Sequence, residues 1–71
     1  MNTPPTPGTF AKVAIQCKYP GTTKEGSFLF TGDSHRNPNN IRSPRFNDCA
    51  ELHRYAVENG WKSEGSGYVK L

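Results

Sequence analysis

The sequence predicts a small α+β domain in which an antiparallel sheet is covered on one face by a single helix. Two patterns indicate this fold class. Apolar and polar side chains alternate over residues 10–19, and apolar side chains recur at helical spacing over residues 44–59. Turn-forming residues separate these two segments. Because the chain has only 71 residues, we expect a single domain with the element order β-β-α-β.

The N-terminal end of the chain is expected to be a flexible tail rather than part of the sheet. Residues 1–9 contain three prolines, three threonines and no charged side chain. Proline is excluded from helix interiors and from central strands, so this Pro/Thr-rich segment has no partner in the predicted fold. The domain itself is therefore expected to span residues 10–71.

The first strand is expected at residues 10–19, where β-branched and aromatic residues alternate with polar ones. One face of this strand is expected to point into the core, and it carries Val13, Ile15, Cys17 and Tyr19. The opposite face is expected to point to solvent, and it carries Lys12, Ala14, Gln16 and Lys18.

The second strand is expected at residues 27–31, after a turn. A Pro-Gly pair at positions 20–21 supplies the favoured central residues of a type II turn. In the strand that follows, we expect Phe28 and Phe30 to point into the core and Leu29 to point to solvent. Two antiparallel strands joined in this way form a hairpin.

The helix is expected at residues 44–59, after a loop rich in Gly, Asn, Asp and Pro at residues 32–42. Ser43 and Pro44 have the residue types preferred for a helix N-cap and first turn, and Gly60 has the type that ends a helix. The helix side expected to face the sheet carries Phe46, Cys49, Ala50, His53, Ala56 and Val57.

A closing strand is expected at residues 68–71, paired with a short strand at residues 61–62. Alternation places Val69 and Leu71 toward the core. It places Tyr68 and Lys70 toward solvent.

The charge of the chain favours an acidic partner. Nine Lys and Arg residues against six Asp and Glu give a net charge of +3. Alternation collects cations and one aromatic ring on the outward sheet face, namely Lys12, Lys18, Tyr68 and Lys70. The loop and the start of the helix add His35, Arg36, Arg42 and Arg45. A second, smaller docking patch is expected on the helix at Leu52 and Tyr55.

These features indicate a small non-enzymatic regulatory or inhibitory protein that docks on an acidic surface of a larger protein through its basic sheet face and loop. Small basic domains without a cofactor occur among regulators and inhibitors, phage-encoded ones included. We expect no catalytic residue and no cofactor. Cys49 and His53 lie four positions apart on the helix, but their expected burial would keep substrates from the thiol.

Two alternatives remain open at this point. The first is a nucleic-acid-binding module that uses the same basic face, with Tyr68 stacking on a base. The second is a small zinc-stabilised domain, because Cys17, Cys49 and His53 are expected to meet in the core and His35 would supply a fourth ligand. Against zinc, the sequence lacks a closely spaced ligand pair such as Cys-x-x-Cys.

Cysteine usage and hydropathy predict a cytoplasmic, reducing location. Small secreted domains usually contain several disulfides, whereas this chain has two cysteines, no recognisable signal segment and no disulfide-rich pattern. The longest apolar run is three residues, at 28–30, far below the ~20 that a membrane span needs. We therefore expect no membrane partner. We also expect a monomer.

Overall fold

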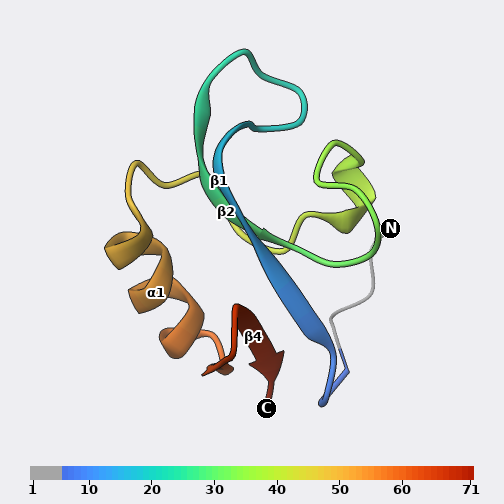
Figure 1. Cartoon of the computed structure of the whole chain (residues 1–71), viewed down its shortest axis with the longest axis vertical. Helices are drawn as coiled ribbons and strands as arrows, with labels where there is room; N and C mark the ends of the chain where they lie inside the picture. The colour runs from blue at the N-terminus through green and yellow to red at the C-terminus, as the bar shows by residue number, and fades with distance from the viewer. Residues whose placement is uncertain (1–5) are drawn as a thin grey trace.

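The computed structural model describes residues 6–71 as a four-stranded antiparallel sheet with one helix packed on one face (Figure 1). The elements are β1 (Phe10–Lys18), β2 (Glu25–Phe30), the 3-10 turn η1 (Pro38–Asn40), α1 (Cys49–Glu58), β3 (Trp61–Glu64) and β4 (Gly67–Lys70). The strand order across the sheet is β2-β1-β4-β3. The predicted α+β class is therefore confirmed, and so is the short strand before the closing one.

Part of the expected N-terminal tail lies outside the described residues, namely residues 1–5. The part that is described already contacts the sheet. The Gly8 N–H donates to the Lys70 carbonyl at 2.8 Å, and the Lys70 N–H donates to the Thr9 carbonyl at 2.9 Å. Backbone pairing with β4 thus begins just before β1.

A β-bulge interrupts β1 and shifts its alternation. Ala14 pairs with Phe28 and Cys17 pairs with Gly26, so β1 has one residue more than β2 between these two pairs. In the bulge, Gln16 has a φ of 53°. This left-handed conformation costs a non-glycine residue about 1 kcal/mol or more. Beyond the bulge, each β1 side chain points to the face opposite the one that simple alternation predicts.

The bulge therefore divides the four side chains that were expected on one face of β1. Val13 packs against the core on the helix side, whereas Cys17 and Tyr19 pack on the other side of the sheet. Ile15 is 60% exposed. The predicted common face was wrong, because one inserted residue reverses the period-two pattern.

The orientation predicted for β2 was also wrong. Leu29 is buried on the helix side with Leu52, whereas Phe28 and Phe30 pack with Ala14 on the opposite side. Both faces of the sheet are covered, one by α1 and the other by the loop that follows β2. A strand buried on both faces has a continuous apolar run, and Phe28, Leu29 and Phe30 form such a run.

The loop after β2 returns along the free edge of that strand. Phe30 forms a bridge with Ile41, and Ser27 forms a bridge with Phe46. Between these bridges, the Leu29 N–H donates to the Ser43 Oγ at 2.8 Å. Ser43 thus satisfies a buried strand amide, although its sequence context predicted a helix N-cap.

The helix begins at Cys49, five residues later than predicted, because residues 41–46 pair with β2. Asp48 is the N-cap, and its Oδ1 accepts from the Glu51 N–H at 2.9 Å. The predicted end is confirmed, since the helix stops at Glu58 and Gly60 has a φ of 83°.

The buried face of α1 differs from the predicted one. Leu52 and Ala56 are the buried helix residues, at 1% and 0% exposure. Leu52 therefore belongs to the core and not to a surface patch. Four of the residues predicted to face the sheet are exposed instead, namely Cys49, Ala50, His53 and Val57.

The closing strand presents the opposite face from the one predicted. Tyr68, opposite Ala11 of β1, is only 8% exposed and joins the core beneath α1. Val69 is half-buried and Leu71 is 69% exposed. In the described part of the chain the only α-helix has ten residues, and no helix is long and apolar enough to cross a membrane.

Candidate functional site

A hollow in the described surface lies where the end of β1 and its turn meet the loop after β2. We call it the turn–loop hollow. Its volume is about 470 Å³. The residues that line it are Cys17, Lys18, Tyr19, Pro20, Gly21, Thr22, His35 and Arg36. It contains the cations of Lys18 and Arg36 but no acidic side chain.

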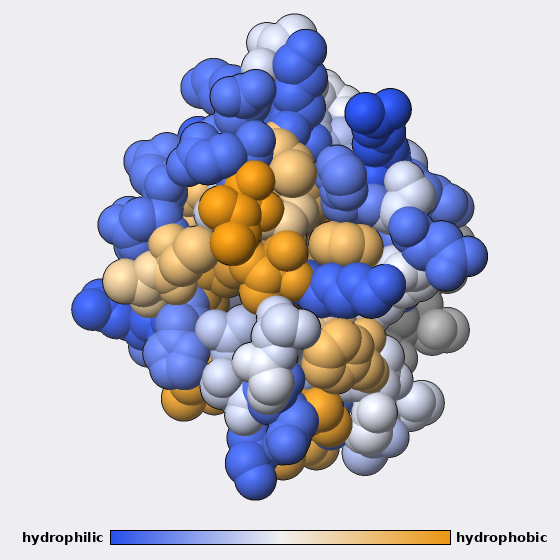
Figure 2. Space-filling model, viewed as in Figure 1, coloured by the Kyte–Doolittle hydropathy of each residue, from blue (hydrophilic) through white to orange (hydrophobic). Residues whose placement is uncertain are grey.

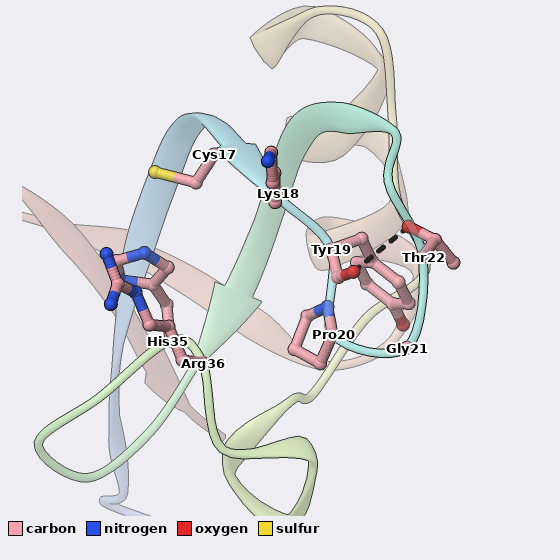
Figure 3. Close-up of a pocket in the computed structure, with 8 residues that line it drawn as sticks. All are labelled: Cys17, Lys18, Tyr19, Pro20, Gly21, Thr22, His35 and Arg36. Carbon is pink, nitrogen blue, oxygen red and sulfur yellow. Dashed lines mark hydrogen bonds between the residues drawn. The ribbon is translucent and has the colours of Figure 1, made fainter.

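The turn after β1 forms one wall of the hollow. The Thr22 N–H and Thr22 Oγ1 both donate to the Tyr19 carbonyl at 3.0 Å, and Gly21 has a φ of 83°. These features confirm the type II turn predicted from the Pro-Gly pair. The second of these hydrogen bonds appears in Figure 3.

Tyr19 fixes this wall to the rest of the fold. Its hydroxyl donates to the Ser43 carbonyl at 2.8 Å, and its ring meets the Phe28 ring edge-on at 5.1 Å between centroids. Burial, and to a lesser extent the neighbouring Tyr55, raises the pKa of Tyr19 above its ordinary value. The hydroxyl therefore stays protonated and keeps its role as a donor.

The loop after β2 forms the opposite wall. Figure 3 shows His35 and Arg36 on one side of the hollow and Tyr19 with Pro20 on the other. The His35 ring centroid lies 5.7 Å from that of Phe30, so the imidazole covers the apolar core. The Arg36 N–H donates to the Ser34 Oγ at 3.1 Å, while the Arg36 side chain is exposed. The loop thus anchors His35 and presents Arg36 to solvent.

The expected basic sheet face is not assembled. Tyr68 is buried, and the Lys70 Nζ donates to the Asn59 carbonyl at 2.6 Å at the end of α1. The same ammonium lies 5.6 Å from the centre of the Trp61 ring. Lys12 is exposed but pairs at the far end of β1 from Lys18. Of the residues predicted for this face, Lys18 alone lines the hollow.

Two further cations stabilise the loop segment beside β2. Arg42 Nη1 donates to the carbonyls of Asn39 and Ile41, at 2.8 and 3.0 Å. Arg45 Nη1 donates to the Glu25 carbonyl at 3.0 Å. The Arg45 stem lies so close to Gly26 that a β-carbon there would be 2.5 Å from Arg45 Cγ. Of the four loop and helix-start residues predicted to bind a partner, only His35 and Arg36 line the hollow.

A second hollow, of about 220 Å³, lies between β1, α1 and the turn that joins β3 to β4. We call it the β1–α1 hollow. It is lined by Val13, Ile15, Cys49, Leu52, Ser63, Gly65, Ser66, Gly67 and Tyr68. The sequence pattern does not predict this hollow, because it depends on the exposure of Ile15 and of Cys49.

The polar groups around the β1–α1 hollow do not form a nucleophile and base. The Tyr68 hydroxyl and His53 Nδ1 share a hydrogen bond of 2.8 Å. Among the hydrogen bonds of residues 6–71, the Cys49 Sγ shares one with the Ser27 Oγ, at 3.8 Å, and none with His53. Burial, followed by the charge of Cys49, raises the pKa of Tyr68.

The four residues considered as zinc ligands lie on opposite sides of the sheet. Cys17 and His35 line the turn–loop hollow. Cys49 lines the β1–α1 hollow, and His53 contacts Tyr68 there. Over residues 6–71, no three His, Cys, Asp or Glu side chains form a group that could hold a metal ion. The geometry therefore gives the zinc alternative no support.

Comparison with known proteins gives no relative from which a role could be transferred. No family model, no curated protein and no solved structure matches the chain. A function must therefore be argued from the geometry of the two hollows.

Proposed function

We propose that this chain is a small non-enzymatic regulatory or inhibitory protein that docks on an acidic surface of a larger protein through the turn–loop hollow. The observation that carries the proposal is the charge of this hollow. The charged groups in its lining are the Lys18 ammonium and the Arg36 guanidinium, with His35 between the loop and the core. A concave site of this kind suits a carboxylate on a protruding side chain of the partner.

The cations of the hollow are available for a partner. None of the hydrogen bonds found among residues 6–71 uses the Lys18 Nζ or the Arg36 guanidinium, whereas Arg42, Arg45 and Lys70 are each bonded to carbonyls. The walls behind them are held by Tyr19 and His35, so binding would require little reordering of the backbone.

The non-enzymatic part of the proposal rests on the arrangement of Cys49 and His53. A cysteine nucleophile needs an adjacent base that a third group orients. Here the Cys49 thiol is hydrogen-bonded to Ser27, and the His53 ring is hydrogen-bonded to Tyr68. We also propose a cytoplasmic, reducing location, supported by two free cysteines on opposite sides of the sheet.

Nucleic acid is the alternative partner for the same cations, but the aromatic rings do not favour it. Single-stranded nucleic acid stacks on exposed rings. Tyr68 is buried, and the Tyr19 ring packs against Phe28 with its hydroxyl bonded to Ser43. We therefore propose a protein partner and keep nucleic acid as an outcome of the test.

The test reverses charge in the hollow and compares it with an equal reversal elsewhere. The immobilised double variant Lys18→Glu/Arg36→Glu is expected to retain a partner protein, captured by the wild-type chain, at least tenfold more weakly. The matched control is Lys62→Glu/Arg54→Glu, which makes the same charge change at exposed positions outside the hollow. Equal retention by both double variants would refute the proposal.

A second arm separates the two partner classes. Labelled DNA and RNA, single- and double-stranded, are titrated at two salt concentrations. We expect no sequence-independent binding at physiological salt. Micromolar affinity that falls steeply with salt and is lost in Lys18→Glu/Arg36→Glu would instead assign the hollow to nucleic acid.

A further inference from the structure

Within residues 6–71, one edge of β1 has no strand beside it over much of its length. Strand β4 pairs with β1 over three residues, Phe10, Ala11 and Lys12. The last of these pairs joins Lys12 to Gly67, where β4 begins. From Val13 to the end of β1, pairing within the described residues is to β2 alone. The edge of β1 that faces away from β2 is therefore open beyond Lys12.

The open edge presents unpaired backbone groups. Val13 lies opposite Leu29, but the N–H and the carbonyl of Leu29 bond to Ser43 and Arg42 on the other side of β2. In an antiparallel pair, the N–H and carbonyl groups of two opposite residues point either all toward the neighbouring strand or all away from it. The N–H and carbonyl of Val13 therefore point away from β2. The direction alternates along the strand, so the groups of Ala14 point toward Phe28 and the N–H of Ile15 points away from β2 again. Such groups are a template for another strand.

A hollow with one apolar wall lies directly beside this edge. The β1–α1 hollow is placed where a strand continuing the line of β4 past Gly67 would run. Val13 and Ile15 form one wall, and Leu52 of α1 lies at its base. Figure 2 shows a hydrophobic patch over the middle of β1, on the side toward α1. Apolar surface left exposed beside polar edge groups favours binding of a peptide.

Charge indicates what kind of segment would bind. Lys12 and Lys18 are exposed and lie at the two ends of the open stretch. Strand β1 contains no acidic residue. A segment with aliphatic side chains in its centre and carboxylates at its ends is therefore complementary to this edge in both polarity and charge.

We propose that the open edge of β1 binds an extended segment of the partner protein by strand addition, with an aliphatic side chain in the β1–α1 hollow and acidic residues near Lys12 and Lys18. The inference rests on the proposed function and deepens it, since Lys18 borders both the open edge and the turn–loop hollow. Main-chain hydrogen bonds supply the pairing, and the hollow selects the side chain.

The probe is the synthetic peptide acetyl-Glu-Val-Thr-Val-Glu-amide, titrated into isotope-labelled full-length chain. We expect saturable amide shifts centred on Val13 and Ile15 and at least tenfold slower hydrogen exchange at these two amides. The peptide with Lys in place of both Glu residues is expected to bind at least tenfold more weakly. Equal binding of the two peptides would overturn the charge argument.

Backbone N-methylation distinguishes strand addition from mere contact with the hydrophobic patch. Successive residues of an added strand point their N–H groups alternately toward and away from β1. Methylating one alternate set of peptide amides should therefore abolish binding, and methylating the other set should leave it nearly unchanged. Equal effects of the two sets would refute strand addition. Because only the peptide is altered, this result does not depend on the folding of a variant.

Variants of the chain separate this inference from the proposed function. Ile15→Ser should weaken peptide binding at least tenfold, whereas Val57→Ser, at a similarly exposed position on α1, should not. Arg54→Glu, at an exposed position outside both hollows, should leave peptide binding unchanged. If the peptide fails to bind while partner capture depends on the turn–loop hollow, the inference alone is wrong. If the Val13 and Ile15 amides are protected without peptide in a concentration-dependent manner, the occupant is a second copy of this chain.

Discussion

The two faces of the sheet are buried by different means. On one face, the regular helix α1 packs Leu52 and Ala56 against the strands, and both side chains are almost completely buried. On the other face, an irregular loop covers the phenylalanine rings of β2 with His35 and half-buried Ile41. Helix packing fixes the first cover, whereas backbone hydrogen bonds along the edge of β2 fix the second.

The difference explains where the candidate binding residues lie. A helix that covers a core presents to the sheet only the few residues that its period allows. A loop held by its backbone leaves most of its side chains free to point outward. Arg36 is presented in this way, beside a loop residue that contributes to the core. The irregular cover can therefore combine a structural and a binding role.

The largest expected effect concerns the apolar contacts of the two covers. Leu52→Ala should lower the free energy of unfolding by about 3 kcal/mol, because it leaves a cavity beneath the helix. Ile41→Ala should lower the free energy of unfolding by only about 1 kcal/mol, because this side chain is half-buried and water can fill part of the space it leaves. Chemical denaturation measures both values. Equal losses would show that the two covers depend on side-chain packing to the same extent.

Ser43 tests the claim that hydrogen bonds fix the loop cover. Ser43→Ala removes the acceptor of the buried Leu29 N–H and should cost about 1–3 kcal/mol. Ser63→Ala is the matched control, because Ser63 is exposed and its loss should change stability by less than about 0.5 kcal/mol. Hydrogen exchange should also become faster at the Leu29 amide in Ser43→Ala. An unchanged exchange rate would contradict the role assigned to Ser43.

The smallest effect is expected at alkaline pH, because each face of the sheet has one tyrosine with a raised pKa. For Tyr19 and Tyr68 the folded state favours the protonated phenol relative to the ordinary pKa of 10.0. Their contribution to stability is therefore fully present below pH 10 and is lost as the pH rises through the folded pKa. Tyr19→Phe and Tyr68→Phe should each reduce the decline in unfolding free energy above pH 10. Variants whose alkaline decline matches that of the wild-type chain would contradict this interpretation.

Much of the architecture could be predicted because it depends on local signals. The alternation of β1, the Pro-Gly turn and Gly60 each act within a few residues of the element that they define. The side of the sheet to which each β1 side chain points could not be predicted, because no glycine or other turn residue marks the bulge at Gln16 in the sequence. The helix start was misplaced since Ser43 bonds to β2, a contact that only the tertiary fold brings about.

The candidate site was predicted only in part, for the same reason. Lys18, His35 and Arg36 come together because a turn and a loop meet, and the sequence indicated both segments. Tyr68 was assigned to the surface by counting alternate residues, but its pairing with Ala11 places its side chain in the core beneath α1. The open edge of β1 was not foreseen, because strand lengths and offsets within the sheet are set by pairing and not by composition.

The bulge at Gln16 also bears on the solubility of the chain. An uninterrupted edge from Val13 to Lys18 would offer pairing positions to any extended polypeptide, including nascent and misfolded chains. The extra residue twists the strand, so a segment that pairs along the whole edge must bend with it. The strained Gln16 backbone therefore limits the number of sequences that can pair with the edge. Deleting Gln16 would straighten the edge at the expense of selectivity, and fibrous self-association at high concentration would be its visible sign.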